Sequence, residues 1–336
     1  ICTNLQCPFS AISVAKTEVP FLEKLGAENV ALYIRSDANR KQAKLSGFTN
    51  IHTSIVTKQE QAETHYVVLC TKPQFLDAVM EEYQALLTAP NVVVISVLAG
   101  KKGKEIQAAY EKASGLEHTL NGVLLMPNTP LMIGKGYSSL CEEFNGKKVA
   151  DSVILDIKQI FLKKSTLSII SKECKMDMAT AIGGSGPAFV YFFFKEHLGR
   201  FDNHLDNSLL DVRNALVNKE STPQSAIFIK NFMNAAMYIS EIPKELLFTQ
   251  AQAQEAVSGM ISSALDYIED TLENTNPANY TDNLDTLIAN VRSKNGTTDA
   301  GLCVLETKAK NTDTADVIIA TVEAAFKRSL ALAKSA

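Results

Sequence analysis

A short string near the C-terminus carries the clearest chemical signal in this sequence. Ser293–Thr298 reads Ser-Lys-Asn-Gly-Thr-Thr and precedes a run of helical period that begins near Thr298. Free backbone N–H groups at a helix N-terminus, together with hydroxyl groups, can capture a small carboxylate. The alternative is a purely structural Ser/Thr helix cap with nothing bound. The string therefore predicts either a carboxylate site or a simple cap.

Three further turns, each after a short apolar run, hold the other polar candidates. They consist of Cys70, Thr71, Lys72 and Pro73; of Ala99 and Gly100; and of Asn128 and Thr129. Turns at the carboxyl ends of parallel strands are where a dinucleotide cofactor binds. Two readings stay open, because Pro73 also suits the start of a helix and Asn128 suits a Pro-Asn turn that bonds its own backbone.

A glycine-rich string precedes the aromatic run Phe189–Phe194. Gly183 and the candidate residues Gly184, Ser185 and Gly186 permit close backbone approach at a helix N-terminus. The string predicts either the floor of a binding site or tight packing by small residues.

These strings need elements to position them, and the apolar pattern indicates two kinds. Strands are expected at 30–34, 66–71, 92–97, 123–125 and 165–170, with helices at 10–25, 74–87 and 147–161. This half, residues 1–170, predicts an α/β Rossmann-like domain with a doubly wound, mostly parallel sheet. Residues 171–336 predict an all-α domain.

Composition excludes several classes of protein. The chain has 336 residues and a net charge of −4, with no Lys/Arg run that suits nucleic acid, and its longest apolar stretches are too short for a membrane helix. The six cysteines form no CxxC pair and the five histidines stand at no metal-ligand spacing, so we expect no disulfide framework and no metal. A cytoplasmic protein is the default expectation, with an organelle left open if the start is incomplete.

Five strings in fixed order resemble pyrroline-5-carboxylate reductases. They are Cys70-Thr-Lys-Pro-Gln74, Val94-Ile-Ser-Val-Leu-Ala-Gly100, Met126-Pro-Asn-Thr-Pro130, Gly184-Ser-Gly-Pro-Ala188 and Ser293-Lys-Asn-Gly-Thr-Thr298. The resemblance runs from about Ser10 to the C-terminus, with an apparent insertion near 198–232. It implies a Rossmann-like domain followed by a helical domain that forms a homodimer or a larger homo-oligomer.

The resemblance also implies an activity and a site. The expected reaction is the NAD(P)H-dependent reduction of 1-pyrroline-5-carboxylate to L-proline. Its substrate carboxylate would lie on the loop that contains Ser293, Asn295, Gly296, Thr297 and Thr298, and Thr298 would be the catalytic residue beside the ring nitrogen. Catalysis would then come from positioning rather than from a strong acid or base.

The end of the second expected strand bears on the cofactor. Arg35 and Ser36 stand where NAD-preferring sheets carry an acidic residue, and they suit a 2′-phosphate instead. We expect NADPH, with NADH possible and with Asn39 and Arg40 as helpers. An exposed Arg35 in a solvated loop is the equally weighted alternative.

Two departures from the family pattern bear on whether the chain can catalyse this reaction. With Ser10–Ile12 aligned to the start of the first helix, the stretch Cys2–Phe9 should carry the glycine motif of dinucleotide-binding folds and has no glycine. Lys294 and Asn295 replace the usual Pro and Gly. Either the glycines were lost with the true start, or the chain is a divergent copy. The alternatives to the reductase are a non-catalytic binding or regulatory subunit and a reductase of another small cyclic imine acid.

Overall fold

The computed structural model describes most of the chain and divides it into two compact units. The described residues are 9–12, 30–34, 37–45, 48–52, 66–88, 92–161, 165–198, 205–273, 279–308 and 314–334. The first unit takes in Ile1–Met126, Leu140–Met176 and Ala331–Ala336, and the second takes in Pro127–Ser139 and Asp177–Leu330.

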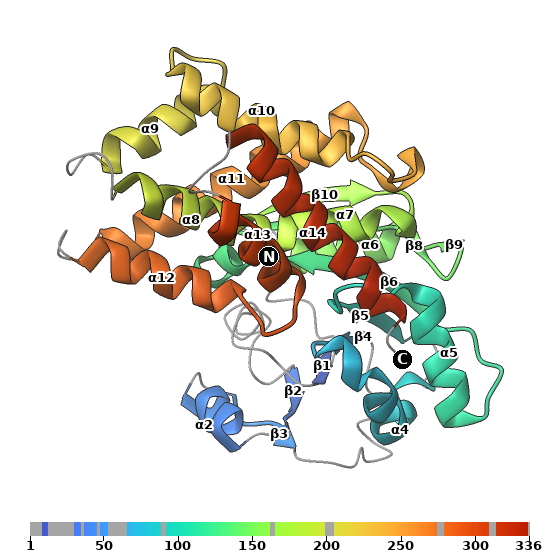
Figure 1. Ribbon diagram of the computed structural model, residues 1–336. Coiled ribbons are helices and arrows are strands. Elements are labelled where there is room, and N and C mark those ends of the chain that lie inside the picture. Colours follow the sequence, from blue (N-terminus) through green and yellow to red (C-terminus); the bar gives the residue numbers. More distant parts are fainter. Residues whose placement is uncertain are drawn as a thin grey trace. The chain divides into compact units, whose positions relative to one another are not determined.

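The sheet that organises the first unit is built from short strands. Its strands are β1 (Phe9–Ile12), β2 (Val30–Tyr33), β3 (Ile51–His52), β4 (Tyr66–Leu69), β5 (Val93–Ser96), β6 (Asn121–Pro127), β7 (Tyr137–Cys141) and β10 (Thr166–Ile170). Their order across the sheet is β10-β7-β6-β5-β4-β1-β2-β3 (Figure 1). The five expected strands are all present, with ends that shift by one to two residues.

The order of the parallel strands creates a topological switch point. β1 pairs in parallel with β2 on one side and with β4 on the other, so Ala11 stands opposite both Leu32 and Val68. From β1 the chain winds outward to β2 and β3, whereas β4, β5 and β6 extend the other way. Sheets of this kind bind ligands where the order reverses, at the carboxyl ends of the strands. The predicted Rossmann-like class is confirmed.

One predicted element is wrong. We expected a helix over Ser10–Leu25, but Ser10–Ile12 belong to strand β1. The apolar run continues from the strand into the following residues without a glycine, so periodicity alone could not separate the two elements. Residues 13–25, which follow β1 in the sequence and lie outside the described residues, contain no glycine.

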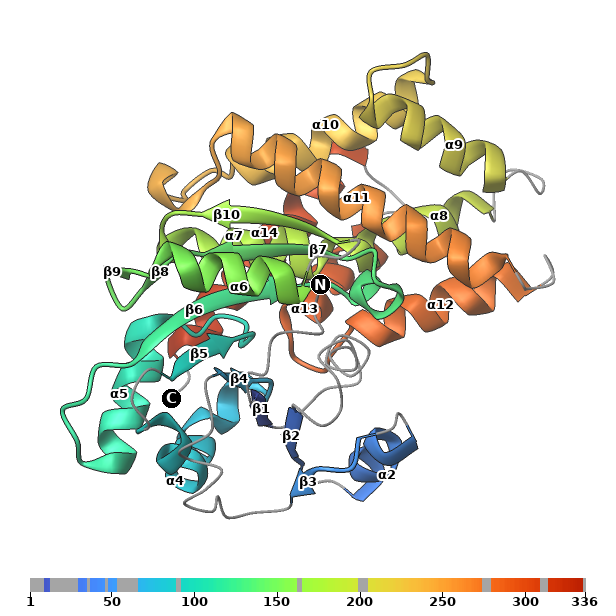
Figure 2. The same cartoon turned by 180° about the vertical axis from the view of Figure 1, so that it is seen from behind.

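Helices α2 (Asp37–Leu45), α4 (Leu76–Leu87), α5 (Gly103–Ser114) and α6 (Asp151–Phe161) complete the first unit, with the short turns η4 (Pro73–Phe75) and η6 (Glu173–Lys175). Helices α4 and α5 lie side by side (Figure 2). Helix α6 begins later than expected because β8 (Glu143–Phe144) and β9 (Lys147–Lys148) form a hairpin. Its turn holds Asn145 and Gly146 at φ 49° and 73°, as a tight Asn-Gly hairpin turn requires.

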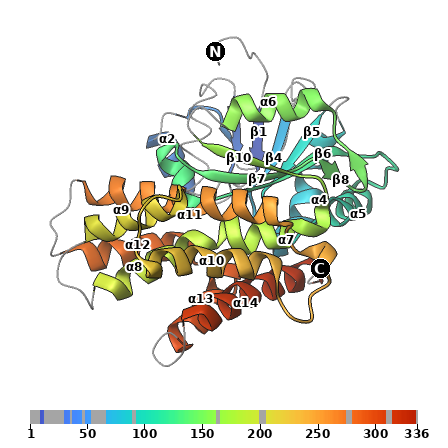
Figure 3. The ribbon, with the colours of Figure 1, turned by 90° about the horizontal axis from the view of Figure 1, so that it is seen from above.

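The second unit is helical, as predicted. Its elements are η5 (Thr129–Ile133), α7 (Met176–Ala179), the π-helical turn η7 (Thr180–Gly184), α8 (Gly186–Leu198), α9 (Leu205–Leu216), α10 (Pro223–Met237), η8 (Lys244–Leu246), α11 (Gln250–Leu272), α12 (Tyr280–Val291), α13 (Thr297–Lys308) and α14 (Thr314–Lys334). Helix α8 packs along α12 and α11 (Figure 3). No helix in the described ranges is long and apolar enough to cross a membrane.

The stretch expected to be an insertion forms α9 and the start of α10. Arg213 of α9 donates to Asp266 (2.7 Å) and Glu269 (2.7 and 2.9 Å) of α11. Asp211 accepts from the N–H of Thr222 (2.8 Å), which begins α10. These contacts join α9 to α11 and to the start of α10.

The ring of Tyr137 lies between two glycines of the second unit. A Cβ built on Gly259 of α11 would stand 2.4 Å from Cδ2 of Tyr137, and one built on Gly183 would stand 3.0 Å from Cε1. Tyr137 has no exposed surface. The close approach of these elements therefore depends on the absence of side chains at positions 183 and 259.

Gly259→Ala should destabilise the protein. Overpacking of this kind costs about 1–3 kcal/mol, which outweighs the roughly 1 kcal/mol that alanine gains over glycine in a helix. The ring of Tyr137 cannot retreat, because Gly183 bounds its other edge. Chemical denaturation would measure the change, with Ser258→Ala as the control. A Gly259→Ala variant as stable as the wild type would contradict this packing.

Candidate functional site

The turn after β4 lies at the carboxyl edge of the first unit's sheet. Cys70 is buried, Lys72 is exposed in an extended conformation, and Pro73 opens the helical turn η4. The N–H of Phe75 donates to the carbonyl of Lys72 (2.9 Å). Pro73 thus starts a helix, while Thr71 and Lys72 remain at the edge where a cofactor would lie.

A second turn follows the neighbouring strand β5. Gly100 takes a left-handed conformation (φ 77°), next to the half-buried Ala99, and the N–H of Lys101 donates to the carbonyl of Leu98 (3.2 Å). The N–H of Val97 donates to the carbonyl of Leu69 (3.2 Å), which joins the ends of β5 and β4. Cys70–Lys72 and Ala99–Gly100 therefore stand side by side at this edge.

The end of β2 is described only in part. Arg35 and Ser36 lie outside the described residues. Arg40 of α2 donates from Nη1 to the carbonyl of Ile34 (2.9 Å) and pairs with Asp37. A guanidinium is therefore held at the carboxyl end of β2, where NAD-preferring sheets carry an acid.

Asn128 serves the second unit as an internal clamp. Its side-chain oxygen accepts from the N–H of Tyr137 (2.9 Å), and its amide donates to the hydroxyl of Ser263 on α11 (2.9 Å). Ser263 in turn donates to the carbonyl of Met260 (2.8 Å). Because the side chain is buried and engaged at both ends, the amide bonds other elements rather than its own backbone.

Thr129, the next residue, lies beside a buried tyrosine. Thr129 Oγ1 and the hydroxyl of Tyr191 both lack a hydrogen bond of good geometry among the described residues, although they lie close enough to interact. Burial raises the pKa of Tyr191, and the proximity of Thr129 opposes that rise. Neither hydroxyl ionises near neutral pH, so the pair is a neutral polar spot in an apolar interior.

The Ser293–Thr298 string forms the loop that leads into α13. Ser293, Lys294 and Asn295 are exposed, whereas Thr297 and Thr298 are 8 % and 4 % exposed and begin the helix. The predicted helix start near Thr298 is confirmed within one residue. The N–H of Gly296 donates to the carbonyl of Ser293 (2.8 Å), which closes the turn.

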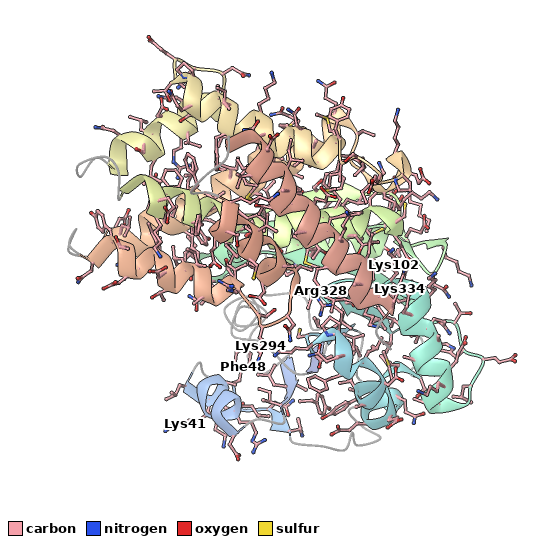
Figure 4. The ribbon with its side chains drawn as sticks, in the orientation of Figure 1. Lys41, Phe48, Lys102, Lys294, Arg328 and Lys334 are labelled. Atoms are coloured by element: carbon pink, nitrogen blue, oxygen red, sulfur yellow. The ribbon has the colours of Figure 1, made fainter. Side chains whose placement is uncertain are left out.

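Asn295 takes the left-handed conformation (φ 60°) that glycine adopts more easily. Its N–H donates to Asp299 (2.9 Å), and its carbonyl accepts from Nε of Arg328 on α14 (2.7 Å). Both polar groups of its backbone are therefore engaged by side chains. Lys294 and Arg328, labelled in Figure 4, place positive charge beside the turn.

Ion pairs between charged side chains also stabilise the same loop. Arg292 donates to Asp299 (2.7 Å) and to Glu306 (2.6 Å). These bonds raise the pKa of Arg292, with Glu306 contributing most. The bond from Arg292, followed by that from Asn295, lowers the pKa of Asp299, so its carboxylate stays charged well below neutral pH.

Three buried hydroxyl groups meet behind the loop. Thr298 donates to Ser185 (3.1 Å), and the hydroxyl of Ser185 also bonds Thr297 (3.0 Å). Ser185 is 1 % exposed. The structure thus brings together two of the predicted strings, at the start of α13 and at the junction of η7 with α8.

The glycines around Ser185 do not open a free helix N-terminus as expected. They lie in a continuous helical run, in which the N–H of Ser185 donates to the carbonyl of Thr180 (2.9 Å). A Cβ on Gly186 would stand 2.8 Å from the side chain of Met260. This string therefore packs two helices closely and presents one hydroxyl, and Gly184, half-buried, adds no side chain.

Several participating residues gave no sequence signal or a weak one. Ser263 and Arg328 lie far along the chain from the groups they bond, so no local pattern indicates them. Asp299 could have been found, because an acid in the first turn of a helix accepts N–H groups of the preceding loop. In the described ranges no group of three or more His, Cys, Asp or Glu side chains is arranged to hold a metal ion.

Comparison with known proteins points to one family. Residues 227–332 match the model of the pyrroline-5-carboxylate reductase dimerisation domain. A putative pyrroline-5-carboxylate reductase 4 of Caenorhabditis elegans is 27 % identical over 168 residues, 50 % of this chain and 54 % of that protein. The pyrroline-5-carboxylate reductase of Corynebacterium melassecola is 34 % identical over 145 residues, 40 % of this chain and 48 % of that protein. The chain spans about half the length of these relatives.

The fold agrees with a solved member of the same family. The structure of a pyrroline-5-carboxylate reductase from Coxiella burnetii superposes with a TM-score of 0.51 at 19 % identity and covers 97 % of this chain and 98 % of that one. The dimerisation-domain match, the relatives and the shared fold agree with the strings in the sequence. In these matches and in its fold the chain resembles the pyrroline-5-carboxylate reductase family.

Proposed function

We propose that this protein reduces 1-pyrroline-5-carboxylate to L-proline with NADPH. The observation that carries the proposal is the loop at the start of α13, where the left-handed turn is preserved although Lys294 and Asn295 replace the usual residues. Behind it stand the buried hydroxyls of Thr297, Thr298 and Ser185.

The loop suits a small carboxylate. The first N–H groups of α13 have no helical partner, and the helix dipole makes this end positive. Lys294 and Arg328 add positive charge, whereas Asp299 is already neutralised by Arg292. An anion of one charge is therefore favoured over a neutral ring.

The first unit suits a dinucleotide at its switch point. Lys72 and the left-handed Gly100 lie at the carboxyl ends of β4 and β5 and would border the nicotinamide half. Arg40 at the end of β2, with the neighbouring Arg35 and Ser36, favours a 2′-phosphate. Residues 13–25, which follow β1 in the sequence, contain no glycine, so we expect weaker pyrophosphate binding than a glycine-rich segment gives.

The chemistry requires orientation rather than a strong acid. A reduced nicotinamide, when bound, would supply a hydride to the carbon of the protonated imine, whose C=N π pair would move onto nitrogen. The protein's groups hold the carboxylate, keep the ring nitrogen beside Thr298 and exclude water from the buried hydroxyls. Neutral hydroxyl groups suffice for this, which fits the absence of an ionisable side chain among Ser185, Thr297 and Thr298.

The helical half supports a homo-oligomer. Residues 227–332, which match the family's dimerisation domain, include most of α10 and all of α11, α12 and α13. We propose a homodimer or a larger ring formed through these helices.

A rival function follows from one observation. The absence of glycine in residues 13–25 favours a relative that keeps the helical half but binds no cofactor, and so acts as a binding or regulatory subunit. A wild-type protein that forms the dimer but does not bind NADPH would support that rival. Faster turnover of a different cyclic imine acid would instead redirect the proposal to another substrate.

Thr298→Ala should lower kcat/KM for 1-pyrroline-5-carboxylate by about 10–100-fold, because a buried hydrogen bond to the reacting ring is worth roughly 1–3 kcal/mol. Substrate-dependent NADPH oxidation measures the loss. Thr307→Ala on the same helix is the control, since its hydroxyl bonds the carbonyl of Cys303 on an exposed face. Absence of turnover in the wild type would reject the reductase.

Arg328→Ala should raise KM for the substrate about fivefold, because the carbonyl of Asn295 loses a charge-assisted hydrogen bond and the turn loosens. The adjacent Lys327→Ala is the matched control, because Lys327 is exposed and pairs with Glu323 on the surface. Steady-state kinetics with substrate varied checks this. Equal KM values in the two variants would show that Arg328 does not contribute to substrate binding.

Arg40→Ala should raise KM for NADPH about three- to tenfold and leave KM for NADH nearly constant, because only NADPH offers a phosphate to the guanidinium. Lys44→Ala, an exposed cation on the same helix, serves as the comparison. Parallel losses with both cofactors would show that Arg40 maintains the end of β2 rather than reading the 2′-phosphate.

A further inference from the structure

Lys101, which follows the turn after β5, is a lysine in the interior of the first unit. Its relative exposure is 4 %, and a lysine is rarely buried to this degree unless its charge is compensated. Its ammonium Nζ lies 3.5 Å from the carbonyl oxygen of Ala333, 232 residues further along the chain. The buried cation therefore contacts the last turn of α14.

The C-terminal end of a helix is a favourable place for a buried ammonium. The last four carbonyl groups of a helix have no partner within it, and the helix dipole makes this end negative. Helix α14 ends at Lys334, so the carbonyl of Ala333 is one of these groups. Leu332 is buried, and the residues from Ala331 onward belong to the first unit, as Lys101 does. The contact thus lies within one compact unit.

The neighbouring lysines differ from Lys101 in exposure. Lys334 is exposed in the last turn of α14 and complements the helix dipole from the solvent side. Figure 4 labels Lys334 and also Lys102, which directly follows Lys101. Lys102 is half-buried and Lys104 is exposed, so among these four lysines only Lys101 is buried. Its burial therefore indicates a specific contact rather than a solvated positive surface.

The backbone of Lys101 closes the turn at the carboxyl edge of the sheet. Its N–H donates to the carbonyl of Leu98 (3.2 Å), and Gly100 between them is left-handed (φ 77°). The N–H of Leu98 donates in turn to the hydroxyl of Ser96 at the end of β5 (3.4 Å). Because the ammonium and the N–H belong to the same residue, a restraint on the side chain of Lys101 also restrains this turn.

We propose that Lys101 is a positioning residue for the cofactor. Its buried ammonium, held at the C-terminal end of α14, fixes the turn Leu98–Lys101 that would border the nicotinamide half. Lys101 itself needs no contact with cofactor or substrate. For the cofactor this inference rests on the proposed function, whereas the coupling between the helix end and the turn can be measured without any ligand.

Hydrogen exchange on the full chain, followed by NMR, tests the coupling. Lys101→Met keeps the length of the side chain and removes the ammonium. The amides of the last turn of α14 and of residue 101 should then exchange roughly two- to thirtyfold faster, the range expected for a cation at a helix C-terminus. Lys101→Arg keeps the charge and should recover most of the protection. Lys104→Met, on the exposed face of α5, is the matched control and should change neither.

A second variant disrupts the contact from the other side. In Ala333→Pro the ring clashes with the carbonyl four residues earlier and removes a helical hydrogen bond, which disturbs the last turn of α14. The amide of Lys101 should again exchange faster. Each single variant should raise KM for NADPH about threefold and leave kcat and KM for the substrate nearly constant. The double variant should be no worse than either single variant, because both changes remove the same interaction.

The outcomes distinguish this inference from the reductase itself. A wild-type protein that does not bind NADPH rejects the proposed function, whereas faster exchange at both ends of the contact in Lys101→Met still supports the anchoring of the turn. Unchanged exchange in Lys101→Met, or additive losses in the double variant, would overturn the inference. If Lys101→Met does not fold, Ala333→Pro decides, because an unchanged exchange rate of the Lys101 amide in that variant also contradicts the coupling.

Discussion

The buried amide of Asn128 is the interaction on which the second unit most depends. A Pro-Asn-Thr-Pro turn leaves the sheet at Pro127, and its return at Tyr137 is fixed by the asparagine oxygen. The other end of the same amide reaches Ser263, so the turn and α11 are held by one side chain. An unmet amide at this depth would cost more than the bonds contribute, so the geometry around it is tightly specified. Because Asn128 binds the N–H of Tyr137, it also helps to hold the ring of Tyr137 between Gly183 and Gly259.

Much of the fold could be read from the sequence because the signals were local. The strands at 66–71 and 92–97 are short β-branched runs bounded by turn residues, and the start of α13 follows an Asn-Gly turn. The helix expected from Ser10 failed because a strand of four residues merges with the apolar pattern after it. The Asn145-Gly146 turn is a strong hairpin signal directly before the expected helix 147–161, and the second strand of that hairpin takes the first residues of the helix.

The site was predictable in its residues but not in its connections. Thr297, Thr298 and Ser185 were named from two separate strings, yet their bonds join positions more than a hundred residues apart. Asn128 was placed at a cofactor edge, where its amide proves to be engaged by Tyr137 and Ser263. Local pattern shows which side chains can donate or accept, whereas only tertiary structure shows which of them have already done so.

In the loop before α13, hydrogen bonds from side chains hold a residue in a left-handed conformation. Where the family usually has glycine, this chain has Asn295, and two side chains, Arg328 and Asp299, grip its backbone from opposite sides. The turn therefore keeps a left-handed residue without a glycine, because side chains hold the backbone of the asparagine. At this position the chain therefore replaces a flexible glycine with an asparagine whose backbone is held by side chains.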